Sequence, residues 1–154
     1  MTGRRSGTGD TEGGPGVDDA ACWSRLAERS HGVLATVHAT RGVDLVPVVF
    51  IVDGGSIVIP IDTVKAKRST RLQRVVNLER DPRCGLLVEY YDDDWSTLWW
   101  VRVHGKAMEC APTDARLALL AARFGQYAPE GAVASTIVLA ADAVTGWEAV
   151  SRSG

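Results

Sequence analysis

We expect a mainly β (α+β) protein, built as an antiparallel barrel of six or seven strands with helices at its ends. Three observations predict this fold. Short apolar segments with the two-residue period of strands are separated by turn residues such as Asp53-Gly54-Gly55. Strands and helices do not alternate in the rhythm that a parallel sheet requires. The chain has 154 residues, of which 45% are hydrophobic, and this length suits one domain with a sizeable core.

The N-terminal region divides into a tail and a helix. The first 17 residues contain six of the chain's 16 glycines and almost no apolar residue, which predicts a flexible tail before a domain that spans residues 18–154. Asp18 then provides an N-cap for a helix that ends near Ser30. Trp23, Leu26 and Ala27 share one face of this helix, so we expect that face to plug the end of the barrel.

Three strands come next, at residues 32–39 (GVLATVHA), 43–53 (VDLVPVVFIVD) and 57–61 (IVIPI). Short turns join them, so they should form an antiparallel meander. The second and third are apolar on both faces, which indicates that both of their sides are covered. Pro47 and Pro60 cannot donate to a ladder, and a turn at residues 54–55 would place them opposite each other. We expect a gap in the pairing there, at which a flat ring could approach the backbone.

A basic segment follows the third strand and leads into a helix. The helix has Leu72, Val75 and Val76 as its apolar stripe and ends at Pro82. Seven basic and two acidic residues lie between residues 65 and 83. Cations are unfavourable at a helix N-terminus unless a bound anion offsets them, and the unpaired N–H groups there bind phosphate. We therefore predict a site for a phosphorylated ligand, with a solvated basic face as the alternative. Its four basic residues are Lys65, Lys67, Arg68 and Arg71.

The C-terminal half continues the barrel. Strands are expected at residues 83–91 and 97–110, separated by an acidic loop, Asp92-Asp93-Asp94, that lacks the ligand spacing of a calcium site. A helix capped by Thr113 or Asp114 should cover residues 112–124. Residues 135–150 then supply one or two closing strands.

The strand at residues 97–110 has two different faces. One is apolar and should lie in the core. Trp100 lies on the other face among polar neighbours, which predicts that this face contacts a partner subunit or a ligand. The apolar face consists of Trp99, Val101, Val103, Gly105 and Ala107. The other consists of Leu98, Trp100, Arg102, His104 and Lys106.

Composition and spacing exclude several functions. A formal net charge of -2, with one local basic cluster, argues against a general nucleic-acid or membrane-surface role. No apolar run approaches the ~18 residues of a membrane span and no signal core is present, so we expect a cytoplasmic protein. The three cysteines and three histidines fit no metal-ligand spacing, which predicts reduced thiols and no metal site. Motifs for hydrolysis, acyl transfer or nucleotide binding are absent, so any catalysis would depend on a bound cofactor.

Between Trp23 and Trp147 the sequence resembles a known family. The segments VLATV, LVPVVFIVDGGSIVIPID, KAKR, VNLERDPR and DWSTLWWVRVHG occur in an order typical of the pyridoxamine-phosphate-oxidase-like split β-barrels. Among these proteins, the chain is similar to the actinobacterial branch that depends on the deazaflavin coenzyme F-420. The resemblance implies a split barrel that forms a homodimer and binds its cofactor in grooves at the subunit interface.

The resemblance also implies roles for individual residues. The chain lacks the additional C-terminal Trp and Arg segment of true pyridoxamine phosphate oxidases, so that activity is not expected. Trp100 and Arg102 would act at the dimer seam. Phosphate and the acidic cofactor tail would be held by Lys65, Lys67, Arg68 and Arg71. The cofactor ring would be lined by Val46, Pro47, Val48, Ile59, Pro60 and Ile61.

Three functions remain open at this point. The first is an F-420-dependent oxidoreductase that transfers hydride to a small unsaturated or conjugated acceptor, with no catalytic residue assigned. The second is an FMN-binding oxidoreductase of the same fold, and the third is a non-catalytic flavin-binding or tetrapyrrole-binding protein. The expected partners are a second copy of the chain and a small-molecule acceptor, with neither nucleic acid nor a membrane.

Overall fold

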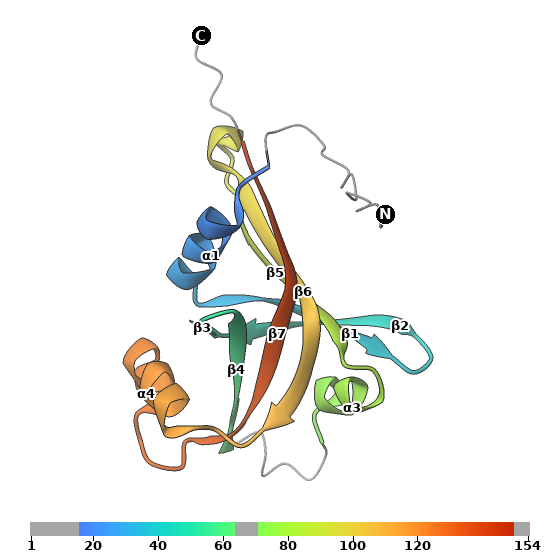
Figure 1. Ribbon diagram of the computed structural model, residues 1–154, viewed down its shortest axis with the longest axis vertical. Coiled ribbons are helices and arrows are strands. Elements are labelled where there is room, and N and C mark those ends of the chain that lie inside the picture. The colour runs from blue at the N-terminus through green and yellow to red at the C-terminus, as the bar shows by residue number, and fades with distance from the viewer. Residues whose placement is uncertain (1–15, 64–70, 150–154) are drawn as a thin grey trace, which may run out of the picture.

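In the part of the chain that the structure describes, the domain consists of one seven-stranded antiparallel sheet and three helices (Figure 1). The structure is a computed structural model that describes residues 16–63 and 71–149. The helices are α1 (Asp19–Glu28), α3 (Gln73–Arg80) and α4 (Asp114–Arg123), with short 3-10 turns η1 (Trp95–Thr97) and η2 (Gly125–Tyr127). The strands are β1 (His31–His38), β2 (Gly42–Val49), β3 (Ile51–Asp53), β4 (Ser56–Asp62), β5 (Arg83–Tyr90), β6 (Trp99–Cys110) and β7 (Val133–Glu148).

The strand order is β2-β1-β5-β6-β7-β4-β3, and all neighbouring strands are antiparallel. Strands β2 and β3 stand at opposite ends of this order but follow each other in the chain, so the chain itself links the two ends of the sheet through Phe50. Of the one or two closing strands expected, the structure has one, β7. The predicted mainly β fold with helices is confirmed.

The predicted strand at residues 43–53 is wrong, because it is two strands separated at Phe50. The Phe50 side chain is fully buried and its N–H donates to the Ser30 carbonyl, which turns the chain from one end of the sheet toward the other. The predicted antiparallel pairing of the first two strands is confirmed by β1 and β2, but the three predicted strands do not form one continuous meander, and the facing prolines are wrong. Pro47 lies opposite Val33 of β1, and Pro60 lies opposite Thr136 of β7. The predicted hairpin between β3 and β4 is confirmed, with Gly54 at a φ of 60° in its turn.

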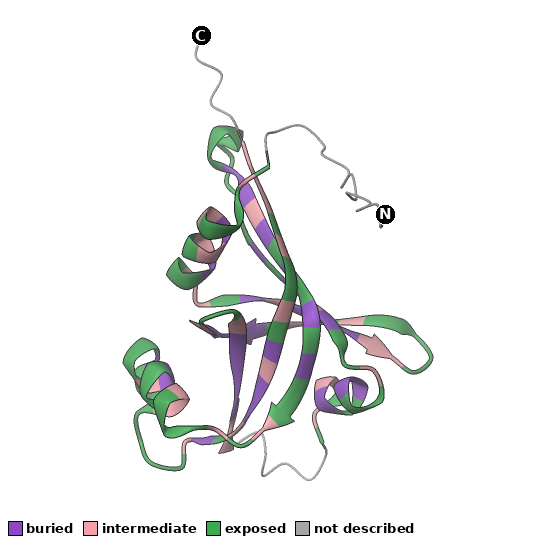
Figure 2. Cartoon of the chain, viewed as in Figure 1, coloured by how far each residue is buried: buried purple, intermediate pink, exposed green. Residues whose placement is uncertain are grey.

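The core lies on the inner face of the sheet. Buried and exposed residues alternate along β5 and β6, so one face of these strands is covered and the other is open, whereas β4 is buried on both faces (Figure 2). Strand β6 shows this most clearly, since its predicted apolar face is buried throughout. Cys22 and Leu26 of α1, and Val75 and Leu78 of α3, complete this core. A second, smaller cluster packs α4 onto the strands through Ile51, Val58, Leu120, Phe124 and Val133.

The helix starts were predicted better than the helix faces. Asp18 caps α1 by accepting from the Ala21 N–H at 2.8 Å, and Thr113 caps α4. In α1, however, Cys22 is buried where Ala27 was expected, and Ala27 is exposed. In α3 the predicted apolar residue Val76 is 40% exposed. Its expected place in the core is taken by the polar residue that follows it, which becomes part of the candidate site.

The N-terminal end of the described chain lies against the last strand of the sheet. Gly16 and Val17, from the end of the predicted tail, pair with Trp147 and Gly146 of β7, whereas the remainder of that tail lies outside the described residues. Cys22, Cys84 and Cys110 are free thiols, as predicted. Within residues 16–63 and 71–149, no helix is long and apolar enough to cross a membrane.

Candidate functional site

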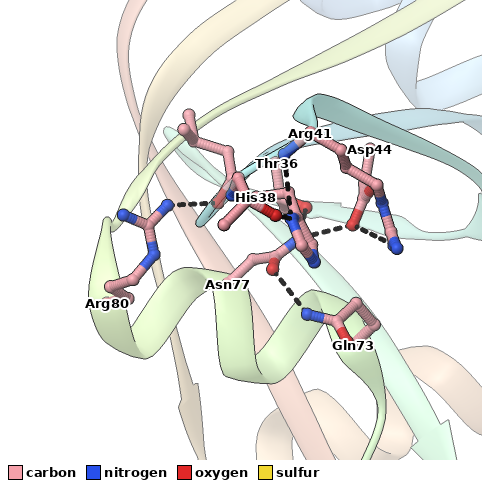
Figure 3. Close-up of polar contacts among 9 residues, drawn as sticks. Thr36, His38, Arg41, Asp44, Gln73, Asn77 and Arg80 are labelled. Carbon is pink, nitrogen blue, oxygen red and sulfur yellow. Dashed lines mark hydrogen bonds and ion pairs between the residues drawn. The ribbon is translucent and has the colours of Figure 1, made fainter.

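Helix α3 is anchored to the β1–β2 hairpin by one buried amide, that of Asn77 (Figure 3). Its Nδ2 donates to Thr36 Oγ1 at 2.9 Å and to Asp44 Oδ2 at 2.8 Å. Its Oδ1 accepts from Gln73 Nε2, one helical turn earlier, at 2.8 Å. A polar side chain that is 2% exposed and fully hydrogen-bonded fixes the position of a helix more strictly than apolar packing does. The network therefore sets where the start of α3 lies relative to the sheet.

Asp44 connects this network to a surface ion pair. Arg41 donates to both oxygens of the Asp44 carboxylate, at 2.7 and 2.9 Å. Together, the Arg41 and Asn77 hydrogen bonds lower the pKa of Asp44 to about 2. Since this pKa lies below that of the unfolded chain, roughly 4, the ionised carboxylate stabilises the fold at neutral pH. That stabilisation should be lost as the pH falls from roughly 4 toward 2.

Replacement of Asn77 by alanine should destabilise the protein by about 2 kcal/mol, because the buried Thr36 hydroxyl and the partly buried Asp44 carboxylate each lose a hydrogen-bond donor. The pKa of Asp44 should rise in this variant, since one of the two hydrogen bonds that lower it is gone. Urea denaturation and an NMR titration of the Asp44 carboxyl measure the two effects. Gln73→Ala is the matched control because it removes only the exposed partner. Equal stability of the two variants would contradict the anchoring role.

The start of α3 has the features of an anion site. Leu72 occupies the N-cap position without a side-chain hydrogen bond, and the first turn has no acidic residue. The Nε of Arg74, in that first turn, is buried and has no hydrogen-bond partner among the residues that the structure describes. Burial lowers the pKa of Arg74, although the nearby Asp62 carboxylate opposes this effect. A buried, unsatisfied guanidinium N–H beside uncapped backbone N–H groups can donate to an oxyanion.

Arg71, which was predicted to hold the anion, is instead occupied by carboxylates. It donates to both oxygens of Glu79, at 2.8 and 2.5 Å, and its guanidinium lies 3.5 Å from Glu109. These partners raise the pKa of Arg71 and neutralise its charge locally. The contact with Glu109 was not predictable from local sequence, because Glu109 lies on β6, far along the chain. The other predicted basic residues, Lys65, Lys67 and Arg68, lie outside the described residues.

Most of the predicted ring-lining residues are buried. Val48, Ile59 and Ile61 belong to the core, and Pro60 is also buried. Val46 is partly buried against the same core. Pro47 is exposed on the side of β2 opposite to Val46 and Val48, because side chains alternate along the strand. Pro47 pairs with Val33 of β1 and Pro60 with Thr136 of β7, so the two prolines do not face each other in the sheet, and their role beside a ring stays a prediction.

The outer face of β2, β1, β5, β6 and β7, which we call the outer sheet face, carries exposed apolar side chains beside charged ones. One row across it runs from Pro47 through Val33, Leu87 and Arg102 to Thr145, which lie opposite one another on successive strands. A second row contains Leu45, Ala35, Gly85, His104 and Ala143. Leu45 is 68% exposed and Leu87 is 42% exposed. Exposed apolar side chains that share one sheet face are typical of an interaction site.

The predicted seam residues lie on this outer sheet face, with one exception. The guanidinium of Arg102 lies 4.9 Å from the Trp100 ring and donates to Thr145 Oγ1. Trp147, opposite Trp100, has a buried indole N–H without an acceptor among the described residues. Leu98, which was expected on this face, precedes β6 and is only 7% exposed.

Among the described residues, no group of His, Cys, Asp and Glu side chains could hold a metal ion. The acidic loop instead satisfies itself. Asp92 accepts from the Tyr90 hydroxyl, and Asp94 caps η1 by accepting from the Ser96 N–H. The loop is thus a turn of defined structure.

Comparison with known protein families identifies the family to which the chain belongs. The family model described as pyridoxamine 5'-phosphate oxidase matches residues 19–151. The chain belongs to the pyridoxamine 5'-phosphate oxidase-like family. The match covers the start of α3, the outer sheet face and the basic segment. A comparison with curated protein sequences gave no match.

Solved structures of low sequence identity share the fold of this pyridoxamine 5'-phosphate oxidase-like chain. An FAD-binding protein from Mesorhizobium loti has a TM-score of 0.63 at 16% identity, over 86% of this chain and 93% of that one. The FAD binding protein from Mycobacterium smegmatis has a TM-score of 0.57 at 17% identity, over 85% and 94%. HutZ, the heme storage protein from Vibrio cholerae, has a TM-score of 0.59 at 13% identity, over 82% and 92%.

Proposed function

We propose that the chain is an oxidoreductase that uses the deazaflavin coenzyme F-420 to reduce a small unsaturated or conjugated acceptor. The observation that carries the proposal is the Arg74 Nε, which is buried without a hydrogen-bond partner among the described residues, at the uncapped start of α3. Family membership supports a cofactor in this fold. When bound, reduced F-420 would supply a hydride, and the chain's residues would bind and orient the cofactor and the acceptor.

The choice of F-420 depends on the distribution of positive charge. F-420 carries a phosphodiester and a carboxylate-bearing tail, whereas FMN ends in one compact phosphate. Basic residues from Lys65 to Arg74 cover more anionic groups than one phosphate presents. Because Arg71 is paired with Glu79, we assign the phosphate contact to Arg74 and the tail contacts to Lys65, Lys67 and Arg68.

An FMN-dependent oxidoreductase is the second candidate. The structural neighbours described as FAD-binding favour a flavin, and one phosphate would suit Arg74 and the backbone N–H groups of α3 equally well. A non-catalytic role is the third candidate, supported by the fold shared with a heme storage protein.

F-420 should bind more tightly than FMN, and the preference should shrink at high salt, because salt screens the exposed tail contacts. The protein should also purify without a tightly held yellow flavin. Quenching of intrinsic Trp fluorescence by F-420, FMN, FAD and haem, at low and high salt, measures the order of affinities. Tighter binding of a flavin, or flavin carried stoichiometrically through purification, would favour the second candidate. Haem as the only ligand would favour the third.

We also propose that two copies of the chain associate through the outer sheet face. Apolar side chains as exposed as Val43, Leu45 and Leu87 on a single sheet face are costly in a monomer. The indole N–H of Trp147, next to Trp100, has no acceptor among the described residues, which is consistent with an acceptor supplied by a second copy. This association would place Trp100 and Arg102 at the seam that the family resemblance implies.

A further inference from the structure

The turn between β1 and β2 is held by the imidazole ring of His38 (Figure 3). His38 is the last residue of β1, and its Nδ1 accepts from the backbone N–H of Thr40 at 3.1 Å and from that of Arg41 at 3.2 Å. A ring nitrogen that accepts a hydrogen bond carries no proton, so the neutral ring of His38 has its proton on Nε2. The turn therefore depends on the uncharged form of this histidine.

A continuous chain of contacts runs from this turn to the start of α3. Arg41, whose backbone N–H is held by His38, donates through its side chain to both oxygens of Asp44. Asp44 accepts in turn from the buried amide of Asn77 on α3. Arg74, the residue of the proposed anion site, lies about one helical turn before Asn77 on the same helix. The ring of His38 is thus connected to the network that positions the anion site.

The charged groups around His38 come from the hairpin and from α3. Arg41 and Asp44 belong to the hairpin, whereas Arg80 of α3 donates to the carbonyl of Val37, the residue before His38. The pKa of Asp44 is about 2, so this carboxylate stays ionised wherever a histidine changes its charge. A proton on Nδ1 would therefore lie among two N–H donors, two cations and one carboxylate.

We infer that protonation of His38 releases α3 from the hairpin, which makes His38 a pH-dependent positioning residue for the anion site. The protonated ring cannot accept from Thr40 and Arg41, and it becomes a donor. Asp44 is the acceptor beside it, so the imidazolium competes with Asn77 for the same carboxylate. The inference rests on the proposed function, because it assumes an anion bound at the start of α3, and it adds control of that binding by pH.

Two substitutions of His38 fix the turn in opposite states. In His38→Asn the side-chain oxygen can accept from the N–H two residues along the chain, as asparagine does in turns, but it does not take up a proton. In His38→Ala the acceptor is absent at every pH. The affinity of the wild-type chain for F-420 should fall about fivefold from about pH 7.5 to about pH 5.5, because one hydrogen bond that fixes α3 is lost.

The two variants should remove this pH dependence in different ways. His38→Asn should keep the higher affinity at both pH values, and His38→Ala should show the lower affinity at both. Any titration of F-420 itself is common to the three proteins and cancels in the ratio of their affinities. His31→Asn, the same change at the exposed first residue of β1, is the matched control and should retain the wild-type pH dependence.

A measurement without cofactor separates this inference from the proposed function. The NMR signals of the Asn77 side-chain amide report its hydrogen bonds to Thr36 and Asp44. They should shift between the two pH values in the wild-type chain and stay constant in His38→Asn. Signals that shift equally in both proteins, or in neither, would overturn the inference. If F-420 binds at neither pH, the proposed function fails, and the Asn77 signals alone decide the inference.

Discussion

Replacement of Arg74 by alanine should weaken cofactor binding about 10- to 100-fold. Each charged hydrogen bond to a phosphate contributes ~1.5 to 3 kcal/mol, and the buried Nε of Arg74 has no other partner among the described residues. The stability of the empty protein should hold or rise, because the variant removes a cation from a helix N-terminus and from a site where burial lowers its pKa. Fluorescence titration and thermal unfolding of the same samples measure both effects.

Arg80→Ala is the matched control for this experiment. Arg80 lies on the same helix, at its other end, and donates to the Val37 carbonyl at 3.0 Å. Its removal should cost a small amount of stability and leave cofactor affinity unchanged. Arg71→Ala should also have a small effect on affinity, since Glu79 already holds its guanidinium. If Arg71→Ala weakens binding and Arg74→Ala does not, the original assignment from the sequence is restored.

Local sequence patterns predicted the buried face of β6 and the starts of α1 and α4. The two-residue alternation along β6 fixed which of its side chains are buried, and Asp18 and Thr113 were recognisable as helix caps. The break at Phe50 was not predictable in this way, because residues 43–53 read as one continuous apolar strand. Its cause is tertiary: a fully buried ring and a hydrogen bond to Ser30.

The candidate site shows a similar division. The basic segment could be located from its charge, but which arginine remains available for an anion depends on Glu79 and Glu109, and Glu109 lies on a distant strand. Asn77 was missed because apolar periodicity assigns the buried positions of α3 to Val75 and Val76. The signal for it was a small amide between two apolar residues of a helix, Val76 and Leu78, and it gains its buried position through partners on β1 and β2. Sequence periodicity cannot identify such partners.

Replacement of Leu87 by arginine should convert the proposed dimer into a monomer. Leu87 lies near the centre of the outer sheet face, between Val33 of β1 and Arg102 of β6. The variant would place an unpaired cation beside Arg102 in the apolar part of the interface, and two-fold symmetry would bury it twice. An uncompensated buried charge costs about 3 to 5 kcal/mol, so the dissociation constant should rise by at least about 100-fold. Sedimentation equilibrium measures this change.

The control is Leu119→Arg, because Leu119 on α4 is 43% exposed and Leu87 is 42% exposed. Both substitutions add one cation at an equally accessible leucine, but only one lies on the outer sheet face. Each monomer should unfold at nearly the wild-type temperature, since neither side chain is buried in the core. If the cofactor site depends on the seam, Leu87→Arg should also lose cofactor affinity whereas Leu119→Arg retains it. A Leu87→Arg variant that remains dimeric would place the interface elsewhere and remove Trp100 and Arg102 from the site.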